Sequence, residues 1–381
     1  MQTPTLGQYL LPNLRSIHWA LRSWDLVPFL RLFLNPGLID VDIQFPDHNL
    51  HIYRPATISL IPTGDLTHLQ FGSEGNDDLS MNALHDLLDR ASETLKSVGL
   101  DEKPSMAVID KLIQLPNLRH LDVQLPETRI SPPSIVFPSL EVLHVFYREA
   151  SSWHHILRNI PNPALRELGV SFRGSSSAYF QTLGSSLFEA NIERTLSSLQ
   201  CSCDESPLTE TGLRSFLSFE RLTRLELLPS CTKERCCSEL NDRIISKLAA
   251  ALPQLTYLAL GGSPCEIPTS DVTITSLVAL SHNCVNLNLL QLHFNAEGIA
   301  SRGTYVNSQA HKFTCKLRTL SVGSQPLPSN RDDIIFVTFA ILHVFPHLET
   351  ISHARGDWDQ VRRDVELFRK ASRIFPPPTT D

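Results

Sequence analysis

The sequence predicts an α/β solenoid, in which short parallel strands alternate with helices along a coil of repeats. Three observations predict this fold class. One leucine-containing phrase recurs from end to end of the 381-residue chain, the phrase alternates apolar and polar residues, and several intervals between phrases have the apolar spacing of helices. We therefore expect about 13 repeats in a horseshoe, with a parallel sheet on the concave side and helices on the convex side.

The recurring phrase is a proline or another helix breaker followed by Leu-x-x-Leu-x-Leu or its Ile, Val and Phe equivalents. This is the pattern of leucine-rich repeats. Clear copies lie at residues 11–17, 115–123, 137–145 and 252–260. The first leucine of each phrase is its anchor. The thirteen anchors are Leu14, Leu38, Leu66, Leu95, Leu118, Leu140, Leu165, Leu196, Leu222, Leu255, Leu287, Leu317 and Leu348.

Successive anchors are 22 to 33 residues apart, around and somewhat beyond the spacing of roughly 20 to 29 residues in leucine-rich repeats. The weakest copy follows Leu196, because its phrase ends in Cys201. Each phrase predicts a short strand with one buried face, and the proline before it ends the preceding helix.

Helical spacing of apolar residues is clearest in four intervals, at residues 106–115, 241–252, 275–284 and 332–345. We expect three of these helices to begin at side chains that can cap them. The expected caps are Asn241 or Asp242, Thr275 and Asp332.

No repeat is expected to fold alone, because burying a few leucines stabilises less than ordering a whole repeat costs. The sequence therefore predicts one solenoid over residues 1–356. A capping helix is expected at 357–375, with Trp358, Val361, Val365, Phe368 and Phe375 on one face. Residues 376–381 are proline-rich and predict a disordered tail. The few residues before the first strand show no capping helix, so we expect that edge to be covered by upstream chain or by another molecule.

Charge and hydropathy bear on the expected partners. The net charge is -7, and like charges do not form long blocks, so we expect no binding of nucleic acid. The first residues lack a secretory signal, and the longest apolar run, at 334–345, is too short to span a bilayer. We therefore expect a cytoplasmic or nuclear protein without a membrane partner.

The phrases at 10–19, 115–123, 252–260 and 280–287 resemble the degenerate repeats of fungal F-box leucine-rich-repeat proteins. The resemblance implies a substrate-recognition region of a ubiquitin ligase receptor. Members of this family dock through their F-box to the Skp-type adaptor of a cullin ligase. The F-box cannot fit before Leu11, so the adaptor and the cullin are expected partners only if an F-box lies upstream. The alternative is a stand-alone interaction scaffold unrelated to ubiquitin.

The polar positions between the strand leucines are expected to face the concave side, where a ligand would bind. A face that binds phosphate should be rich in Arg and Lys, whereas these positions mix His, acids and amides, so we expect a protein or peptide ligand. Several histidines could make that binding sensitive to pH; the competing interpretation is that these residues are simply the solvated side of the strands. The candidates are Ser16, His18, Asp40, Asp42, His68, Gln70, His120, Asp122, His144, Glu167, Arg224, Glu226 and Tyr257.

No catalytic signature occurs in the sequence: the nucleophile elbow, the phosphate loop, the dinucleotide motif and the zinc-protease motif are all missing. We therefore expect no catalytic residues and no cofactor. A hydrolase hidden in the array would instead gather Ser, His and an acid in a deep pocket. The pairs Cys201-x-Cys203 and Cys231-x4-Cys236-Cys237 are poorly spaced for zinc, so we expect no metal ion. We expect reduced thiols, with Cys284 at a buried apolar position, and His154 and His155 on a surface helix.

Overall fold

The computed structural model divides the chain into two compact units, residues 1–171 and residues 172–381. The structure describes residues 9–20, 26–45, 53–72, 78–101, 103–125, 137–147, 164–174, 176, 178–204, 206–230, 240–261, 270–296, 314–322, 327–328, 330–353 and 358–374.

Thirteen strands in the described residues form a parallel sheet whose order follows the sequence, from β1 to β13. This confirms the predicted fold class. The first unit contains β1 (Ser16–Ala20), β2 (Asp40–Gln44), β3 (His68–Gly72), β4 (Ser97–Leu100), β5 (His120–Gln124), β6 (Val142–Tyr147) and most of β7 (Glu167–Phe172). The second contains β8 (Ser198–Asp204), β9 (Arg224–Ser230), β10 (Tyr257–Leu260), β11 (Leu289–Leu292), β12 (Thr319–Val322) and β13 (Thr350–His353).

Every strand begins two residues after one of the predicted anchors. Twelve anchor leucines are buried, and Leu14 in the first repeat is half-buried. The weak copy keeps the same frame, because Leu196, Leu199 and Cys201 are all buried. The thiol of Cys201 therefore occupies the place of a core leucine, as a small apolar side chain can.

Within each unit, a shared peptide oxygen joins one repeat to the next. The carbonyl of Arg15, directly before β1, accepts hydrogen bonds from the N–H groups of Ile39 (2.8 Å) and Asp40 (3.1 Å), at the start of β2. These paired bonds set the register between neighbouring strands before the strands begin. The same pair of hydrogen bonds recurs at other carbonyls. These belong to Ile39, Thr67, Lys96, Arg119 and Glu141 in the first unit and to Ser197, Thr223, Thr256, Asn288 and Arg318 in the second.

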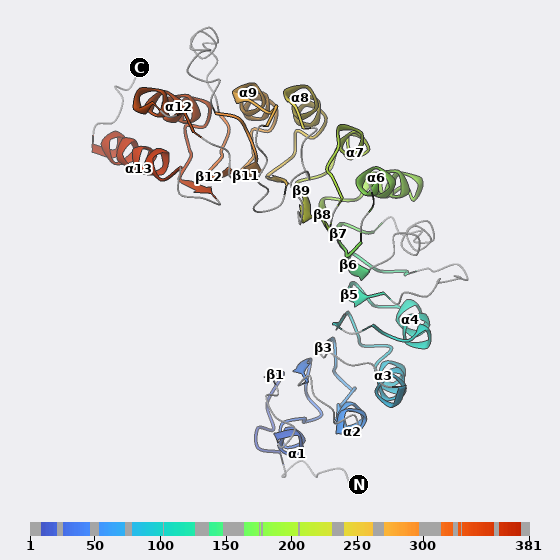
Figure 1. Ribbon diagram of the computed structural model, residues 1–381. Helices are drawn as coiled ribbons and strands as arrows, with labels where there is room; N and C mark the ends of the chain where they lie inside the picture. The colour runs from blue at the N-terminus through green and yellow to red at the C-terminus, as the bar shows by residue number, and fades with distance from the viewer. Residues whose placement is uncertain are drawn as a thin grey trace, which may run out of the picture. The chain divides into compact units, whose positions relative to one another are not determined.

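In each unit the helices cover one face of the sheet and leave the opposite face open (Figure 1). We call this uncovered side the open face. The described helices of the first unit are α1 (Val27–Leu30), α2 (Tyr53–Leu60), α3 (Asp78–Arg90) and α4 (Met106–Ile113). Those of the second are α6 (Tyr179–Glu189), the 3-10 turn Ile192–Arg194, α7 (Glu210–Arg214), α8 (Asp242–Ala251), α9 (Ile274–Asn283), α12 (Arg331–Val344) and α13 (Asp359–Ile374).

Two of the expected helix caps are wrong. Asn241 caps α8 as expected, accepting a hydrogen bond from the N–H of Ile244. However, α9 is capped by Thr273 instead of Thr275, and α12 by Asn330 instead of Asp332. Thr273 and Asn330 have extended backbones, so each lies just outside its helix, where a capping residue must be.

Asp242 links two repeats instead of capping its own helix. One carboxylate oxygen accepts from the N–H of Thr273 (2.7 Å) and from the hydroxyl of Ser276 (2.6 Å), and the other accepts from the hydroxyl of Thr273 (2.6 Å). A carboxylate at a helix N-terminus is stabilised by the unpaired N–H groups there. Asp242 of α8 therefore ties the start of α9 to the preceding helix.

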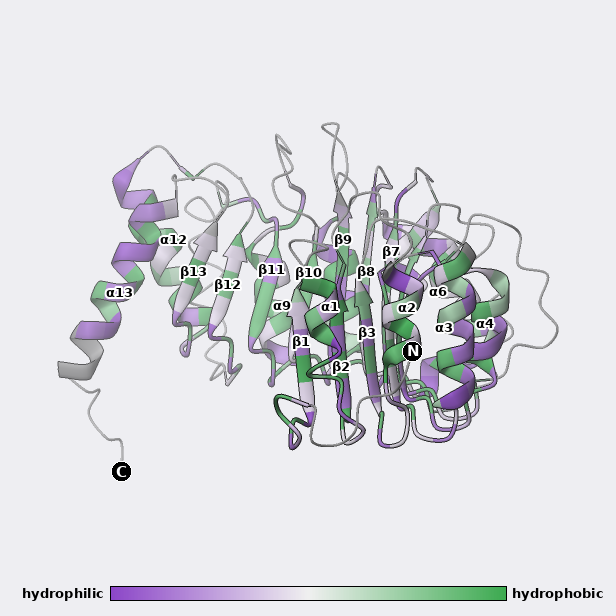
Figure 2. Cartoon of the chain, turned by 90° about the horizontal axis from the view of Figure 1, so that it is seen from below, coloured by the Kyte–Doolittle hydropathy of each residue, from purple (hydrophilic) through white to green (hydrophobic). Residues whose placement is uncertain are grey.

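The expected C-terminal helix is present as α13, and it contacts α12 and β13. Val361 and Val365 of α13 and Trp358 directly before it are buried, and the ring of Trp358 packs edge-on against Phe294 (5.5 Å between centroids). Figure 2 shows the hydrophilic residues that occupy much of the remaining surface of α13. Phe375 and the tail at 376–381 lie outside the described residues.

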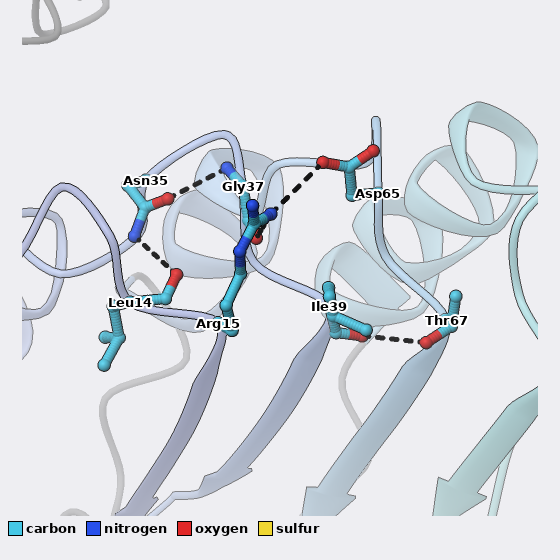
Figure 3. A network of polar contacts seen from close by, with 7 residues as sticks. All are labelled: Leu14, Arg15, Asn35, Gly37, Ile39, Asp65 and Thr67. Carbon is cyan, nitrogen blue, oxygen red and sulfur yellow. Dashed lines mark hydrogen bonds and ion pairs between the residues drawn. The ribbon is translucent and has the colours of Figure 1, made fainter.

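The buried side chain of Asn35 connects the turn before β2 to the segment before β1 (Figure 3). The Asn35 side chain is 1% exposed, and its amide nitrogen donates to the carbonyls of Leu11 (3.1 Å) and Leu14 (3.0 Å). Its amide oxygen accepts from the N–H of Gly37 (2.8 Å). Beside it, Arg15 donates to the carbonyl of Gly37 (3.0 Å). The polar groups of the buried Asn35 side chain are therefore paired, and they tie this turn to the segment before β1.

Replacing Asn35 with Ala should lower the free energy of unfolding of the first unit by about 1–3 kcal/mol, because the substitution removes the three hydrogen bonds of this buried side chain. Asn117→Ala is the matched control, since the exposed Asn117 side chain donates one bond to the carbonyl of Glu93, and its loss should cost about 0.5 kcal/mol or less. Urea denaturation followed by tryptophan fluorescence measures both. Equal effects of the two substitutions would contradict the role given to Asn35.

Candidate functional site

The open face of the first unit carries two rows of side chains, because the parallel register aligns equivalent positions of successive repeats. The first row contains Ser16, Asp40, His68, Ser97, His120 and Val142. The second contains His18, Asp42, Gln70, Gly99, Asp122 and His144. The candidates that the sequence predicted in this unit are therefore neighbours across strands. Glu167 of β7 joins them through its contact with His144.

Polar contacts across strands order the beginning of these rows. The Ser16 hydroxyl donates to Asp40 (2.9 Å), and Nδ1 of His18 lies 2.5 Å from Oδ2 of Asp42. Gln44 donates to the other oxygen of Asp42 (3.1 Å). The His68 ring instead contacts the hydroxyl of its neighbour Thr67 (2.7 Å). The first two repeats thus present an ordered His-carboxylate-amide group to solvent.

Glycines on the neighbouring strands make room for side chains to lie flat on the sheet. A Cβ at Gly72 would lie 1.6 Å from Oε1 of Gln44, and a Cβ at Gly99 would meet Oε1 of Gln70 at the same distance. Gly169 likewise receives the ring of His144, whose Cδ2 would be 2.5 Å from a Cβ. These glycines were not among the sequence candidates, although each stands at or next to a predicted open-face position.

His144 lies between two carboxylates. Its Nδ1 is 3.9 Å from Asp122 and its Nε2 is 3.4 Å from Glu167. The interaction with Asp122, aided by Glu167, raises the pKa of His144 above its ordinary value, although partial burial acts in the opposite direction. A protonated His144 therefore bridges β5, β6 and β7 on the open face.

Asp101, which directly follows β4, adds a carboxylate that the sequence analysis did not select. Gln70 donates to it (3.2 Å). Burial raises the pKa of Asp101, and the nearby charges of Asp122 and Asp42 raise it further. Asp40, Asp42, Asp101, Asp122 and Glu167 thus make the open face of this unit acidic, with its histidines as the groups that can offset that charge.

In the second unit the predicted candidates form one compact cluster. The guanidinium of Arg224 lies 3.9 Å above the ring of Tyr257 and donates to Glu226 (2.6 Å). Arg224 pairs with Tyr257 across β9 and β10 in the sheet register. Burial raises the pKa of Tyr257, with a further contribution from the charge of Glu226.

Glu226 differs from the other candidates because it is only 7% exposed. The competing interpretation, that these residues are simply the solvated side of the strands, therefore does not describe this side chain. Its neighbours explain the difference, since the larger Arg224 and Tyr257 lie beside it. A buried carboxylate requires a paired cation, so Glu226 serves to hold Arg224 in place.

The remaining open-face positions in the described strands of the second unit carry uncharged residues, which are not among the predicted candidates. Gln291 is ordered, because its amide donates to the carbonyl of Gly261 (2.9 Å). The other residues in these two rows are Ser198, Gln200, Ala259, Leu289, Thr319, Ser321, Thr350 and Ser352.

The described cysteines are core residues. Cys284 contacts the carbonyl of Leu252 through its thiol (3.5 Å), and the thiol of Cys315 contacts the carbonyl of Cys284 (3.5 Å). Burial raises the pKa values of Cys203 and Cys284 to about 12. Such thiols are unreactive, and the buried position predicted for Cys284 is confirmed.

Metal-ligand clusters are not found in the described residues, where no group of three or more His, Cys, Asp or Glu side chains could hold an ion. Cys231, Cys236 and Cys237 lie outside the described residues, as do His154 and His155. Among the described helices, none is both long and apolar enough to cross a membrane.

No protein-family model matches the chain, and no curated protein matches it. The class of the protein, a parallel α/β repeat fold compatible with leucine-rich repeats, therefore rests on the sheet, its register and the buried anchors.

The raised pKa of His144 predicts a pH-dependent contribution to stability. The contribution is complete below the ordinary His pKa of about 6.5, and it is lost as the pH rises through the raised pKa of the folded protein. His144→Gln should therefore destabilise the first unit more at about pH 5.5 than at about pH 8.5, by less than about 1 kcal/mol because the ring is partly exposed. Urea denaturation at both pH values measures the difference, with His68→Gln as the control. An equal pH dependence in both variants would contradict the bridge.

Buried thiols predict resistance to alkylation. Iodoacetamide reacts with thiolates, so Cys203 and Cys284 should stay unmodified in the native protein at about pH 8 and react after unfolding in urea. Peptide mass spectrometry measures the modified fraction. Rapid labelling of Cys284 in the native protein would show that the core around it opens readily.

Proposed function

We propose that this chain is a non-catalytic protein-binding repeat domain whose ligand docks on the open face of the sheet. The observation that carries the proposal is the pair of polar rows, whose side chains are already held by contacts across strands. Ordering side chains is one of the costs of association, so a surface ordered before binding loses less free energy when a partner arrives.

The chemistry of the two units supports a protein ligand. Carboxylates and histidines dominate the open face of the first unit, which would repel a phosphate backbone. In the second unit, Arg224 and Tyr257 form a stacked pair. Arg and Tyr are enriched among the residues that carry most of the binding energy in protein interfaces.

We further propose that the domain is the substrate-recognition region of an F-box-type ubiquitin ligase receptor that acts in the cytoplasm or nucleus. The support is the resemblance of the phrases at 115–123, 252–260 and 280–287 to the repeats of that family. A Skp-type adaptor and a cullin would then be partners through an F-box upstream of this chain. The second candidate is a stand-alone scaffold, and the repeat fold suits it equally well.

Quantitative affinity purification tests the open face. Tyr257→Ala should reduce the recovery of the specific partner by about tenfold or more, because loss of an interface hot spot costs about 1–2 kcal/mol or more. Asp42→Asn combined with Asp122→Asn tests the first unit in the same way. Phe188→Ala is the matched control, since Phe188 is an aromatic residue of α6 that is 55% exposed.

A partner that is retained by the open-face variants and lost with Phe188→Ala would overturn the proposal. The co-purified proteins also separate the two finer candidates. Recovery of a Skp-type adaptor and a cullin with the natural protein supports the ligase receptor, whereas one unrelated protein supports the scaffold.

A further inference from the structure

A hollow of about 550 Å³ lies in the second unit, beside the starts of β11, β12 and β13 and next to α13. Two residues from the segment before each strand line the hollow: the residue directly before the strand and the residue third before it. The hollow is therefore a product of the repeat, because equivalent positions of adjacent strands are about 4.8 Å apart. The three pairs are Asn286 and Asn288, Lys316 and Arg318, and His347 and Glu349.

Cations outnumber carboxylates in this hollow. Arg369 of α13 joins the six strand-edge residues, so the lining holds Lys316, Arg318 and Arg369 against the single carboxylate of Glu349. Nη1 of Arg318 lies 4.0 Å from Oε1 of Glu349, and Nη1 of Arg369 lies 3.9 Å from the same atom. Two guanidiniums from different elements thus converge on one oxygen at distances that are long for a hydrogen bond.

The third cation is also oriented. Nζ of Lys316 lies 3.1 Å from Oδ1 of Asn286, which places the ammonium between the first and second repeats of the hollow. The amide of Asn286 is neutral, so this contact does not offset the charge of Lys316. The lining consequently keeps a net positive charge after Glu349 is counted, in a chain whose overall net charge is -7.

We propose that this hollow binds a phosphate dianion, either as a free ion or as the phosphate of a modified side chain on a bound protein. Guanidinium groups match phosphate oxygens in planar, paired hydrogen bonds, and a lysine adds a point charge. A phosphorylated side chain carries nearly two negative charges at neutral pH, which the excess of cations can balance. The site lies at the edge of the sheet, so it is distinct from the open face and does not depend on the protein-binding role proposed above.

Titration calorimetry on the full chain at low salt tests the site. The probes are inorganic phosphate, a phosphoserine peptide and the same peptide without phosphate. We expect saturable binding of the first two at one site, and Arg318→Gln or Arg369→Gln should each weaken it by about tenfold, since a bond to a charged group contributes about 1.5 kcal/mol or more. Arg362→Gln is the matched control, because Arg362 lies on the same helix but pairs with Asp359 (3.1 Å).

Glu349→Gln separates the site from a purely structural ion pair. Removing this carboxylate should strengthen phosphate binding, whereas damage to the fold would weaken it, and thermal melting of every variant confirms folding. Tighter binding of the phosphopeptide than of the free ion identifies a modified protein as the source of the phosphate, and equal binding identifies the free ion. Failure of the unmodified chain to bind phosphate, or an equal loss with Arg362→Gln, would overturn the proposal.

Discussion

The structure depends on a peptide oxygen that is shared between repeats. Within each unit, the carbonyl directly before one strand accepts two N–H groups from the start of the next strand, as at Arg15, Lys96 and Thr256. This pair of hydrogen bonds fixes the register of the two strands, and the register decides which side chains face the helices. Burial of the anchor leucines on one face and alignment of the polar rows on the other therefore have a common cause.

The strands could be predicted because their signal is local. Alternation within a few residues specifies a half-buried strand, and a leucine two residues earlier marks its start, so all thirteen strands begin where the phrases place them. Even the copy at Leu196 was recognisable, since Cys201 is apolar enough to replace a leucine. The positions facing away from the helices follow from the same alternation, which is why most candidates lie where they were expected.

Contacts between repeats could not be predicted, because they depend on intervals of unequal length. Asn35 pairs with carbonyls more than twenty residues earlier in the chain, and Asp242 reaches the start of the following helix. Glu226 is buried by side chains of its own and the next strand, and Arg369 comes from the final helix. The predictions of two helix caps were wrong for a local reason. Several side chains near the start of a helix can accept the same hydrogen bond, and the sequence gives a helix boundary only to within a residue or two.

The hydrogen bonds to the shared carbonyl are the same from repeat to repeat, which explains how the chain accommodates repeats of different lengths. Anchors are as close as 22 residues, between Leu118 and Leu140, and as far apart as 33, between Leu222 and Leu255, yet the strands keep one frame. Insertions between a strand and the next anchor are therefore compatible with the coil. A single residue inserted between an anchor and its strand would instead exchange the inner and outer side chains of that strand, so the evolutionary freedom of this fold lies almost wholly in the segments that connect one strand to the next anchor.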